Sequence, residues 1–180
     1  MSKIDDLIER YDQHVALPWR SRLADQQKVW FVVYPPPYER RLRARIDEFR
    51  LATSRADKRW LRCDLTDAFP EWMSSHEYRD GYFGAPDAIA HALEEDFTEH
   101  VAAQVRAVLE SDEAVAESVV ALTGLGTLFG LTRVSTVVQR VESSIRGRLV
   151  VFFPGRHQQS TYRFLDARDG WDYLATPIKV

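Results

Sequence analysis

The sequence contains a single cysteine and no long apolar segment. Cys63 stands alone among 180 residues, so the chain can form neither an intramolecular disulfide nor a zinc site built on cysteines. Its apolar runs are all shorter than the roughly 20 residues that cross a bilayer. The N-terminus lacks the basic and apolar stretches of a secretory signal. We therefore expect a cytoplasmic protein that is neither secreted nor membrane-spanning.

The signatures of common catalytic sites are missing as well. The sequence has no G-x-S-x-G nucleophile elbow and no phosphate loop that ends in Lys-Ser or Lys-Thr. Two pairs, His91 with Glu95 and Asp96 with His100, have the spacing of one helix face. The pairs are offset by about 140° of helix rotation, so they do not converge on a metal ion. We predict no catalytic residue, no cofactor and no metal.

Two aspartates come closest to an acid pair. Asp64 and Asp67 lie at the predicted carboxyl end of a strand, where parallel sheets bind their ligands. Paired carboxylates can hold magnesium or act as a base. Asp67 also directly precedes a predicted helix, and a helix cap is its simpler interpretation.

Three apolar runs carry the strongest structural signal. Residues 29–34, 119–122 and 149–153 do not alternate with polar residues, a pattern typical of parallel strands that are buried on both faces. Residues 59–65 read as a shorter strand near an edge, because charged residues interrupt it. We predict one α/β domain over residues 1–180, with a mostly parallel sheet of about four to six strands and helices on both faces. It would resemble a P-loop-type domain without the P-loop.

Helical spacing and turn residues predict the elements between these strands. Ser2 is expected to cap a first helix, Thr66 or Asp67 a third and Asp87 the longest one, which would end near Ser111. The remaining expectations are a second helix through about residue 55, a loop at 80–86, a helix around 134–141, and closing strands at 162–165 and 173–176 around an Asp169-Gly170 turn.

A glycine-rich segment begins directly after the strand at 119–122, where a helix N-terminus could hold a phosphate. Its spacing, G-x-G-x-x-x-G, is one residue longer than the dinucleotide fingerprint. The apolar residues within it, such as Leu128 and Phe129, favour a structural turn that packs inward. If an anion does bind, Gly124 and Gly126 would hold it and Arg133 would be its cation.

The net charge of −3 conceals a division along the chain. Residues 39–62 carry +5, residues 64–117 carry −12 and residues 133–168 carry +5. This pattern suits a protein partner with its own charge pattern better than a nucleic-acid surface. The alternative is that the charges are only the solvated faces of surface helices.

One aromatic cluster stands in a polar segment that glycines interrupt. Tyr78, Arg79, Tyr82 and Phe83 lie among charged residues, whereas most other aromatic residues are expected in the core. Exposed aromatic and arginine side chains are typical anchors of protein interfaces. These four residues are our candidate partner interface, and simple packing of the segment is the alternative.

Several short segments, taken in order, resemble the BrxB family of bacterial BREX (bacteriophage exclusion) systems. The resemblance covers almost the whole chain and rests on many segments, not on one catalytic motif. The triple proline at 35–37 is unusual for the family. The segments are IDDLIERY (4–11), LPW (17–19), VWFVVY (29–34), DLTDAF (64–69), EWM (71–73), HEYR (76–79), RLVVFFPG (148–155) and YRFLDARDGW (162–171).

The resemblance implies a component of a phage-defence system that methylates host DNA and blocks replication of unmethylated phage DNA. Its implied partners are a PglX-like methyltransferase, a PglZ-like phosphatase-superfamily protein and a BrxC-like AAA+ ATPase. The family offers no catalytic activity to carry over, so the implied role is an assembly or adaptor protein, with DNA contacted weakly or indirectly. Two alternatives stay open: a degenerate nucleotide-binding domain, and a DNA-binding subunit that uses the arginines of 40–62 and 133–168.

Overall fold

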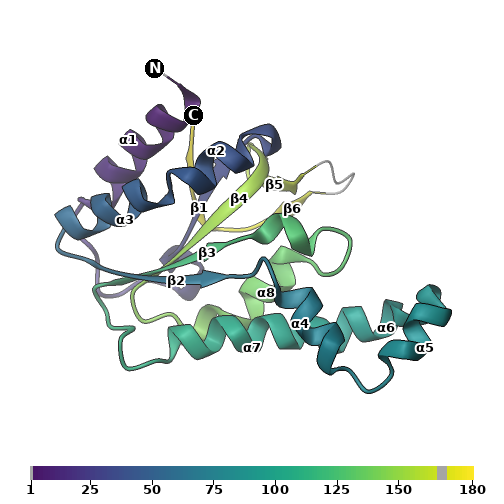
Figure 1. Ribbon diagram of the computed structural model, residues 1–180. Helices are drawn as coiled ribbons and strands as arrows, with labels where there is room; N and C mark the ends of the chain where they lie inside the picture. Colours follow the sequence, from purple (N-terminus) through teal and green to yellow (C-terminus); the bar gives the residue numbers. More distant parts are fainter. Residues whose placement is uncertain (1, 166–169) are drawn as a thin grey trace.

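The computed structural model describes residues 2–165 and 170–180, and a mostly parallel sheet lies at its centre (Figure 1). Five parallel strands run in the order β2-β3-β4-β1-β7. The far half of β4 continues into an antiparallel extension with β5 and β6. The strands are β1 (Val29–Tyr34), β2 (Arg59–Asp64), β3 (Ser118–Thr123), β4 (Arg148–Gln158), β5 (Thr161–Phe164), β6 (Trp171–Asp172) and β7 (Thr176–Lys179).

Helices cover both faces of this sheet. Figure 1 shows α1, α2 and α3 on one face and α4, α7 and α8 on the other. The α-helices are α1 (Lys3–Val15), α2 (Glu39–Ala44), α3 (Ile46–Arg55), α4 (Ala68–Ser75), α5 (Arg79–Gly84), α6 (Ala90–Ala92), α7 (Thr98–Leu109) and α8 (Val134–Val141). The short helices are η1 (Asp25–Lys28), η2 (Pro36–Tyr38), η3 (Pro86–Ile89), the π-helical turn η4 (Leu93–Phe97), η5 (Leu125–Leu128) and η6 (Glu142–Ser144). No helix within the described ranges is long and apolar enough to cross a membrane.

The predicted fold class is confirmed. Every residue of β1 and β3 is buried, as a strand covered on both faces requires. β2 has one neighbour and buries only Cys63, so it is the edge strand that its charges predicted. The sheet has seven strands, one more than the upper end of our prediction, because short β5 and β6 extend β4.

The two faces of the sheet carry separate hydrophobic cores. Under α1 and α3, Tyr11 and Phe152 pack edge-on against Phe49, and the Tyr11 hydroxyl bonds Thr53 Oγ1 at 2.7 Å. Under α4, α7 and α8, the larger core extends from β1 to the tip of β5. Burial of apolar surface in both cores holds the sheet between the two helical layers.

The second predicted helix is broken in two. Arg45 leaves helical geometry, with φ −115° and ψ 13°, and separates α2 from α3. Its guanidinium forms ion pairs with Asp5 of α1 and Glu48 of α3. The break places this cation between two helices, a contact that local spacing does not reveal.

The segment predicted as a loop at 80–86 contains α5, so that prediction is wrong. Tyr82 packs against the imidazole of His76, with ring centroids 5.1 Å apart, which offsets the two helix-weakening glycines. Asp87 does not cap the long helix, because that residue lies inside η3 and Ala85 precedes it. The long helix is instead a series of η3, α6, η4 and α7.

Other predicted details shift by a few residues. Asp67 occupies the position before α4, but its side chain makes no capping hydrogen bond. Of the two predicted closing strands, the first corresponds to β5. The second, at 173–176, is replaced by β6, which pairs with β5 at two residues, and by β7, which pairs with β1. Asp169 of the predicted turn lies outside the described residues. Leu128 is buried as expected, whereas Phe129 is 47% exposed and does not pack inward.

Candidate functional site

At the carboxyl edge of the sheet, polar side chains form hydrogen bonds and an ion pair with one another. Asp64 accepts hydrogen bonds from the backbone and hydroxyl of Thr66, at 3.0 and 2.5 Å, and pairs with Arg62 at 3.0 Å. Desolvation raises the pKa of Asp64, but the Thr66 hydrogen bonds and the charges of Arg62 and Arg43 outweigh it and lower the pKa overall. A carboxylate engaged in this way is a structural acceptor and a poor base.

Gly124 packs directly against this turn. It has a φ of +77°, and a Cβ there would lie 2.5 Å from Thr66 Oγ1 and 2.6 Å from Asp64 Oδ1. The glycine therefore allows close approach of β3 to the Asp64 turn. Arg133 lies in a surface groove that neither Gly124 nor Gly126 lines. The anion site formed by these three residues stays a prediction.

The interior strand β1 also ends without phosphate-binding geometry. Residues 35–37 are all proline, so this turn lacks the backbone N–H groups with which a phosphate loop cradles its ligand. The Tyr34 hydroxyl donates a 2.5 Å hydrogen bond to Glu39 Oε2. Burial and then the Glu39 carboxylate raise the pKa of Tyr34. The polar side chains of Tyr34 and Glu39 at the end of β1 are thus bonded to each other.

Cys63 and groups of possible metal ligands are the remaining candidates for reactive chemistry. Burial, assisted by Asp64, raises the pKa of the Cys63 thiol to about 11, so little thiolate forms at neutral pH. In the described part of the chain, no group of three or more His, Cys, Asp or Glu side chains could hold a metal ion.

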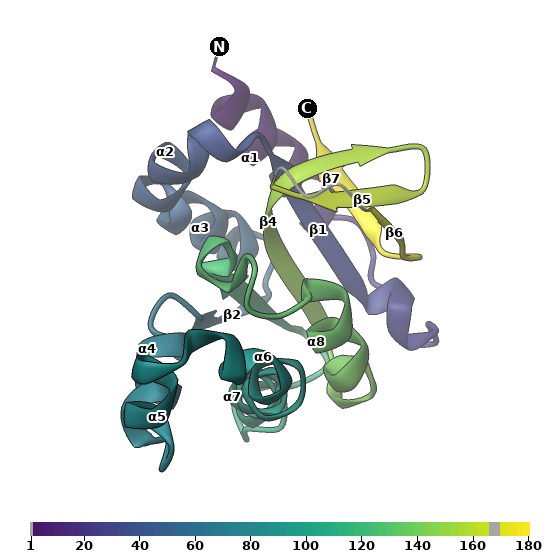
Figure 2. The same cartoon turned by 90° about the vertical axis from the view of Figure 1, so that its right-hand side faces the viewer.

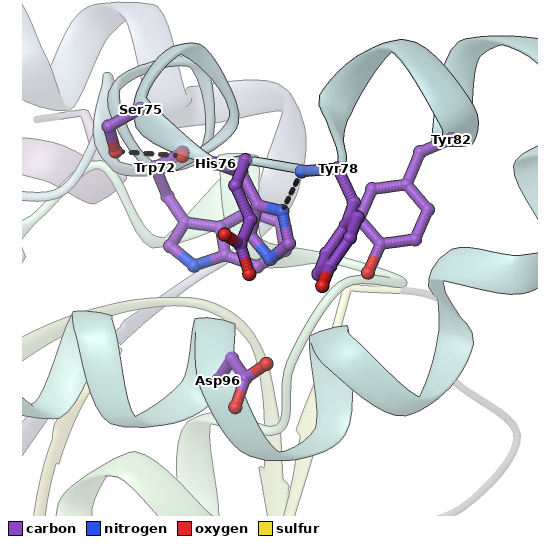
Figure 3. A pocket seen from close by; sticks show the side chains of 7 residues that line it. Trp72, Ser75, His76, Tyr78, Tyr82 and Asp96 are labelled. Carbon is purple, nitrogen blue, oxygen red and sulfur yellow. Dashed lines mark hydrogen bonds between the residues drawn. The ribbon is translucent and has the colours of Figure 1, made fainter.

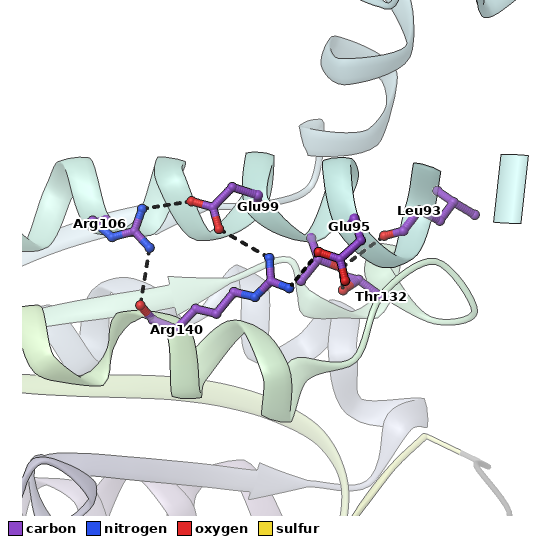
Figure 4. Close-up of polar contacts among 7 residues, drawn as sticks. Leu93, Glu95, Glu99, Arg106, Thr132 and Arg140 are labelled. Carbon is purple, nitrogen blue, oxygen red and sulfur yellow. Dashed lines mark hydrogen bonds and ion pairs between the residues drawn. The ribbon is translucent and has the colours of Figure 1, made fainter. Parts of the chain in front are cut away.

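The acidic and basic segments meet between α7 and α8. Glu99 pairs with Arg106 at 3.0 Å and with Arg140 at 3.2 Å, and Arg140 reaches Glu95 at 3.5 Å (Figure 4). Arg106 also donates to the Arg140 carbonyl at 3.2 Å. Some charges of the acidic and basic segments are therefore paired with each other within the fold.

Two further arginines of the basic segment are used internally. Arg146 donates to the carbonyls of Ser111 and Ala114, and the buried Arg148 stacks on Trp19 at 4.6 Å. Arg168 lies outside the described residues. A DNA-binding surface needs arginines that are free to contact phosphates, and these two are occupied.

The candidate interface residues lie at the outer end of a projecting segment. We call residues 68–92, from α4 to α6, the α5 lobe; Figures 1 and 2 show α5 at the periphery, away from the sheet. Tyr78 is 63% and Phe83 69% exposed. Arg79 donates to the Ser74 carbonyl at 2.6 Å, and Tyr82 is half-buried against the core. The structure thus brings all four residues to one exposed corner.

A pocket of about 490 Å³ opens beside this corner (Figure 3). Tyr78 and Tyr82 line it together with Trp72, His76 and Asp96. Sequence reasoning missed the last three as site residues. Trp72 has the spacing of a core residue, and Asp96 lies on a different helical element, so no local pattern connects them.

A second, larger groove of about 800 Å³ lies between the π turn η4 and the segment before α8. Phe129 and Trp171 contribute aromatic surface to it, and Arg133 contributes a cation. At its edge the Thr98 hydroxyl bonds the Leu93 carbonyl at 3.0 Å and Thr132 Oγ1 at 2.5 Å. These contacts hold the π turn in place.

Comparison with known proteins identifies the family. A family model described as BREX protein BrxB matches residues 66–178, which includes the α5 lobe, α7, β3, α8 and β4 to β6. No curated protein and no solved structure matches the chain. Because the family model covers more than half of the chain, this protein belongs to the BrxB family and is a component of a BREX phage-defence system.

Proposed function

We propose that this protein is a non-catalytic assembly or adaptor component of its BREX system. In this role it binds one or more of the catalytic members: the PglX-like methyltransferase, the PglZ-like phosphatase-superfamily protein or the BrxC-like ATPase. Its contact with DNA is indirect or weak, through these partners.

The exposed aromatic pair Tyr78 and Phe83 carries this proposal. Both side chains belong to one short stretch, and each leaves more than half of its surface in water. Aromatic groups of this kind gain binding free energy when a partner desolvates them. The carboxyl edge of the sheet, by contrast, pairs Asp64 with Thr66 and presents prolines after β1. The geometry therefore favours recognition over chemistry.

Co-purification tests the proposal. Tagged protein is purified from a host that carries the complete BREX gene cluster, and the bound BREX proteins are identified by mass spectrometry. The double variant Tyr78→Ser/Phe83→Ser should weaken binding to the direct partner by about 2 kcal/mol or more, or roughly 30-fold. Its melting temperature should stay near that of the wild type, because both side chains are exposed.

Leu174→Ser is the matched control, since Leu174 is 76% exposed but lies outside the α5 lobe. It should leave the partners bound. Retention of every partner by the double variant, or equal loss with Leu174→Ser, would contradict the proposed interface.

Absence of catalysis is tested separately. The purified protein should show no nucleotide hydrolysis, nuclease or methyltransferase activity. ATP turnover that co-purifies with the protein and disappears in Gly126→Val would overturn this part of the proposal.

A further inference from the structure

The pocket of the α5 lobe has walls made largely of aromatic rings. The imidazole of His76 lies among these rings, with ring centroids 4.7 Å from Trp72, 5.1 Å from Tyr82 and 6.0 Å from Tyr78. Figure 3 shows these side chains on one side of the cavity, with the hydroxyls of both tyrosines directed toward the helix that carries Asp96. The faces of aromatic rings carry partial negative charge and attract cations.

The His76 ring is held by the backbone of its own segment. Its Nδ1 accepts a 3.2 Å hydrogen bond from the backbone N–H of Tyr78. This contact fixes the ring among its aromatic neighbours, so that the ring contributes aromatic surface to the pocket lining.

Two carboxylates complete the lining. Glu77 belongs to the α5 lobe, and Asp96 lies on the π turn η4, on the wall opposite Trp72 and His76 (Figure 3). Ion pairs of the described residues engage their neighbours Asp80 and Glu95, but none includes Glu77 or Asp96. A pocket lined by π faces and two carboxylates without ion-pair partners favours a cation and repels an anion.

The surroundings extend the same preference. Residues 77–96 contain six acidic side chains, and Arg79 is the one lysine or arginine among them. Arg79 does not line the pocket, because its guanidinium donates to the Ser74 carbonyl and lies near Asp80. The exposed ring of Tyr78 lines the pocket, and Phe83, exposed on the same short segment, adds apolar surface to the lobe.

We propose that the pocket receives an arginine side chain from a basic surface of the partner protein. This inference rests on the proposed adaptor function and adds the chemistry of the partner. A guanidinium can stack flat on the half-buried Tyr82 ring while its N–H groups donate to Asp96, whereas an ammonium can do only one of these well. The exposed ring of Tyr78 then packs against the inserted side chain.

The first test uses small probes on the isolated protein. N-acetyl-arginine amide is titrated while the indole N–H signal of Trp72, assigned with Trp72→Phe, is followed by NMR. N-acetyl-citrulline amide is the neutral isosteric control. The arginine probe should shift the Trp72 signal and bind roughly two- to fivefold more tightly than the citrulline probe. Equal responses, or no response to the arginine probe, would overturn the proposal.

The second test separates this inference from the adaptor function. Asp96→Asn and Glu77→Gln remove charge without changing side-chain size, and each should weaken both the arginine probe and the co-purified partner roughly two- to fivefold. Glu94→Gln, on the same π turn but outside the pocket, should change neither. If Tyr78→Ser/Phe83→Ser releases the partner while the two neutral variants bind normally, the adaptor function stands and the arginine pocket is wrong.

Discussion

Two aromatic clusters in this molecule have similar ring spacing and very different surroundings. In the buried cluster, Phe31 packs against Tyr162 at 4.5 Å and Trp171 at 5.5 Å, and both Phe31 and Tyr162 are fully enclosed. In the pocket of the α5 lobe, the rings around His76 lie at comparable distances, yet Tyr78 is 63% exposed.

The polar groups differ in the same way. In the buried cluster, the Tyr162 hydroxyl donates to the Ala175 carbonyl at 3.0 Å and the Tyr173 hydroxyl donates to Glu142. The lobe instead places two carboxylates beside its rings. Aromatic residues thus stabilise the fold where their polar ends are satisfied, and they are available for recognition where their surroundings stay open.

The largest expected effect is on the buried cluster. Phe31→Ala should lower the free energy of unfolding by about 3–5 kcal/mol, because it removes a ring from a closely packed core. Urea denaturation followed by circular dichroism measures it. A loss below about 1 kcal/mol would mean that the cluster is not a unit of stability.

A smaller effect is expected from a single buried hydroxyl. Tyr162→Phe keeps the ring but leaves the buried Ala175 carbonyl without its donor. The free energy of unfolding should fall by about 1–3 kcal/mol. Tyr78→Phe, which removes an exposed hydroxyl, serves as the control; similar losses in both variants would erase the distinction between the clusters.

The stability contributed by α7, which continues from the π turn, depends on pH through the ion pairs of Glu99. The hydrogen bond from Arg106 is the main cause of a lowered pKa at Glu99, and Arg140 contributes further. Because the folded-state pKa lies below the ordinary value of 4.5, this stabilisation is complete above pH 4.5 and is lost as pH falls through the lowered pKa.

Exposure limits the size of this contribution to no more than about 1 kcal/mol. Glu99→Gln should therefore reduce the difference between the unfolding free energies at neutral and acidic pH. Glu94→Gln is the control variant. An unchanged pH dependence in Glu99→Gln would show that the α7–α8 pairs add nothing measurable.

The smallest effect on stability is expected at Phe83, the exposed neighbour of the pocket residue Tyr82. Phe83→Ala should change the free energy of unfolding by no more than about 0.5 kcal/mol, although it removes as many atoms as Phe31→Ala. Thermal unfolding of the two variants, measured side by side, compares the clusters directly. A large destabilisation by Phe83→Ala would place this ring in the core and remove its role as an interface anchor.

The sequence predicted those parts of the fold that repeat locally. The buried strands β1, β3 and β4 follow from unbroken apolar runs, and the edge position of β2 follows from its charges. Contacts between distant residues were not predictable in this way. The break at Arg45 depends on Asp5, and α5 depends on the contact of Tyr82 with His76.

The candidate site, too, was only partly predictable from the sequence. Tyr78 and Phe83 could be proposed because aromatic rings in a polar, glycine-broken segment are unusual for a core. The pocket beside them could not, because it joins Trp72 of α4 to Asp96 of η4. Only the packing of the lobe on the π turn brings these side chains to one cavity.

The π turn also sets how α6 joins α7. A π turn contains one residue more than the α-helical hydrogen-bond pattern, and each residue of a helix turns the chain by about 100°. Deletion of one residue within Leu93–Phe97 would therefore change the rotation of α6 relative to α7, while α4 stays anchored in the core through the buried Trp72 and Met73. Because Asp96 lies on this turn and Trp72 on α4, the extra residue fixes how the two walls of the pocket face each other.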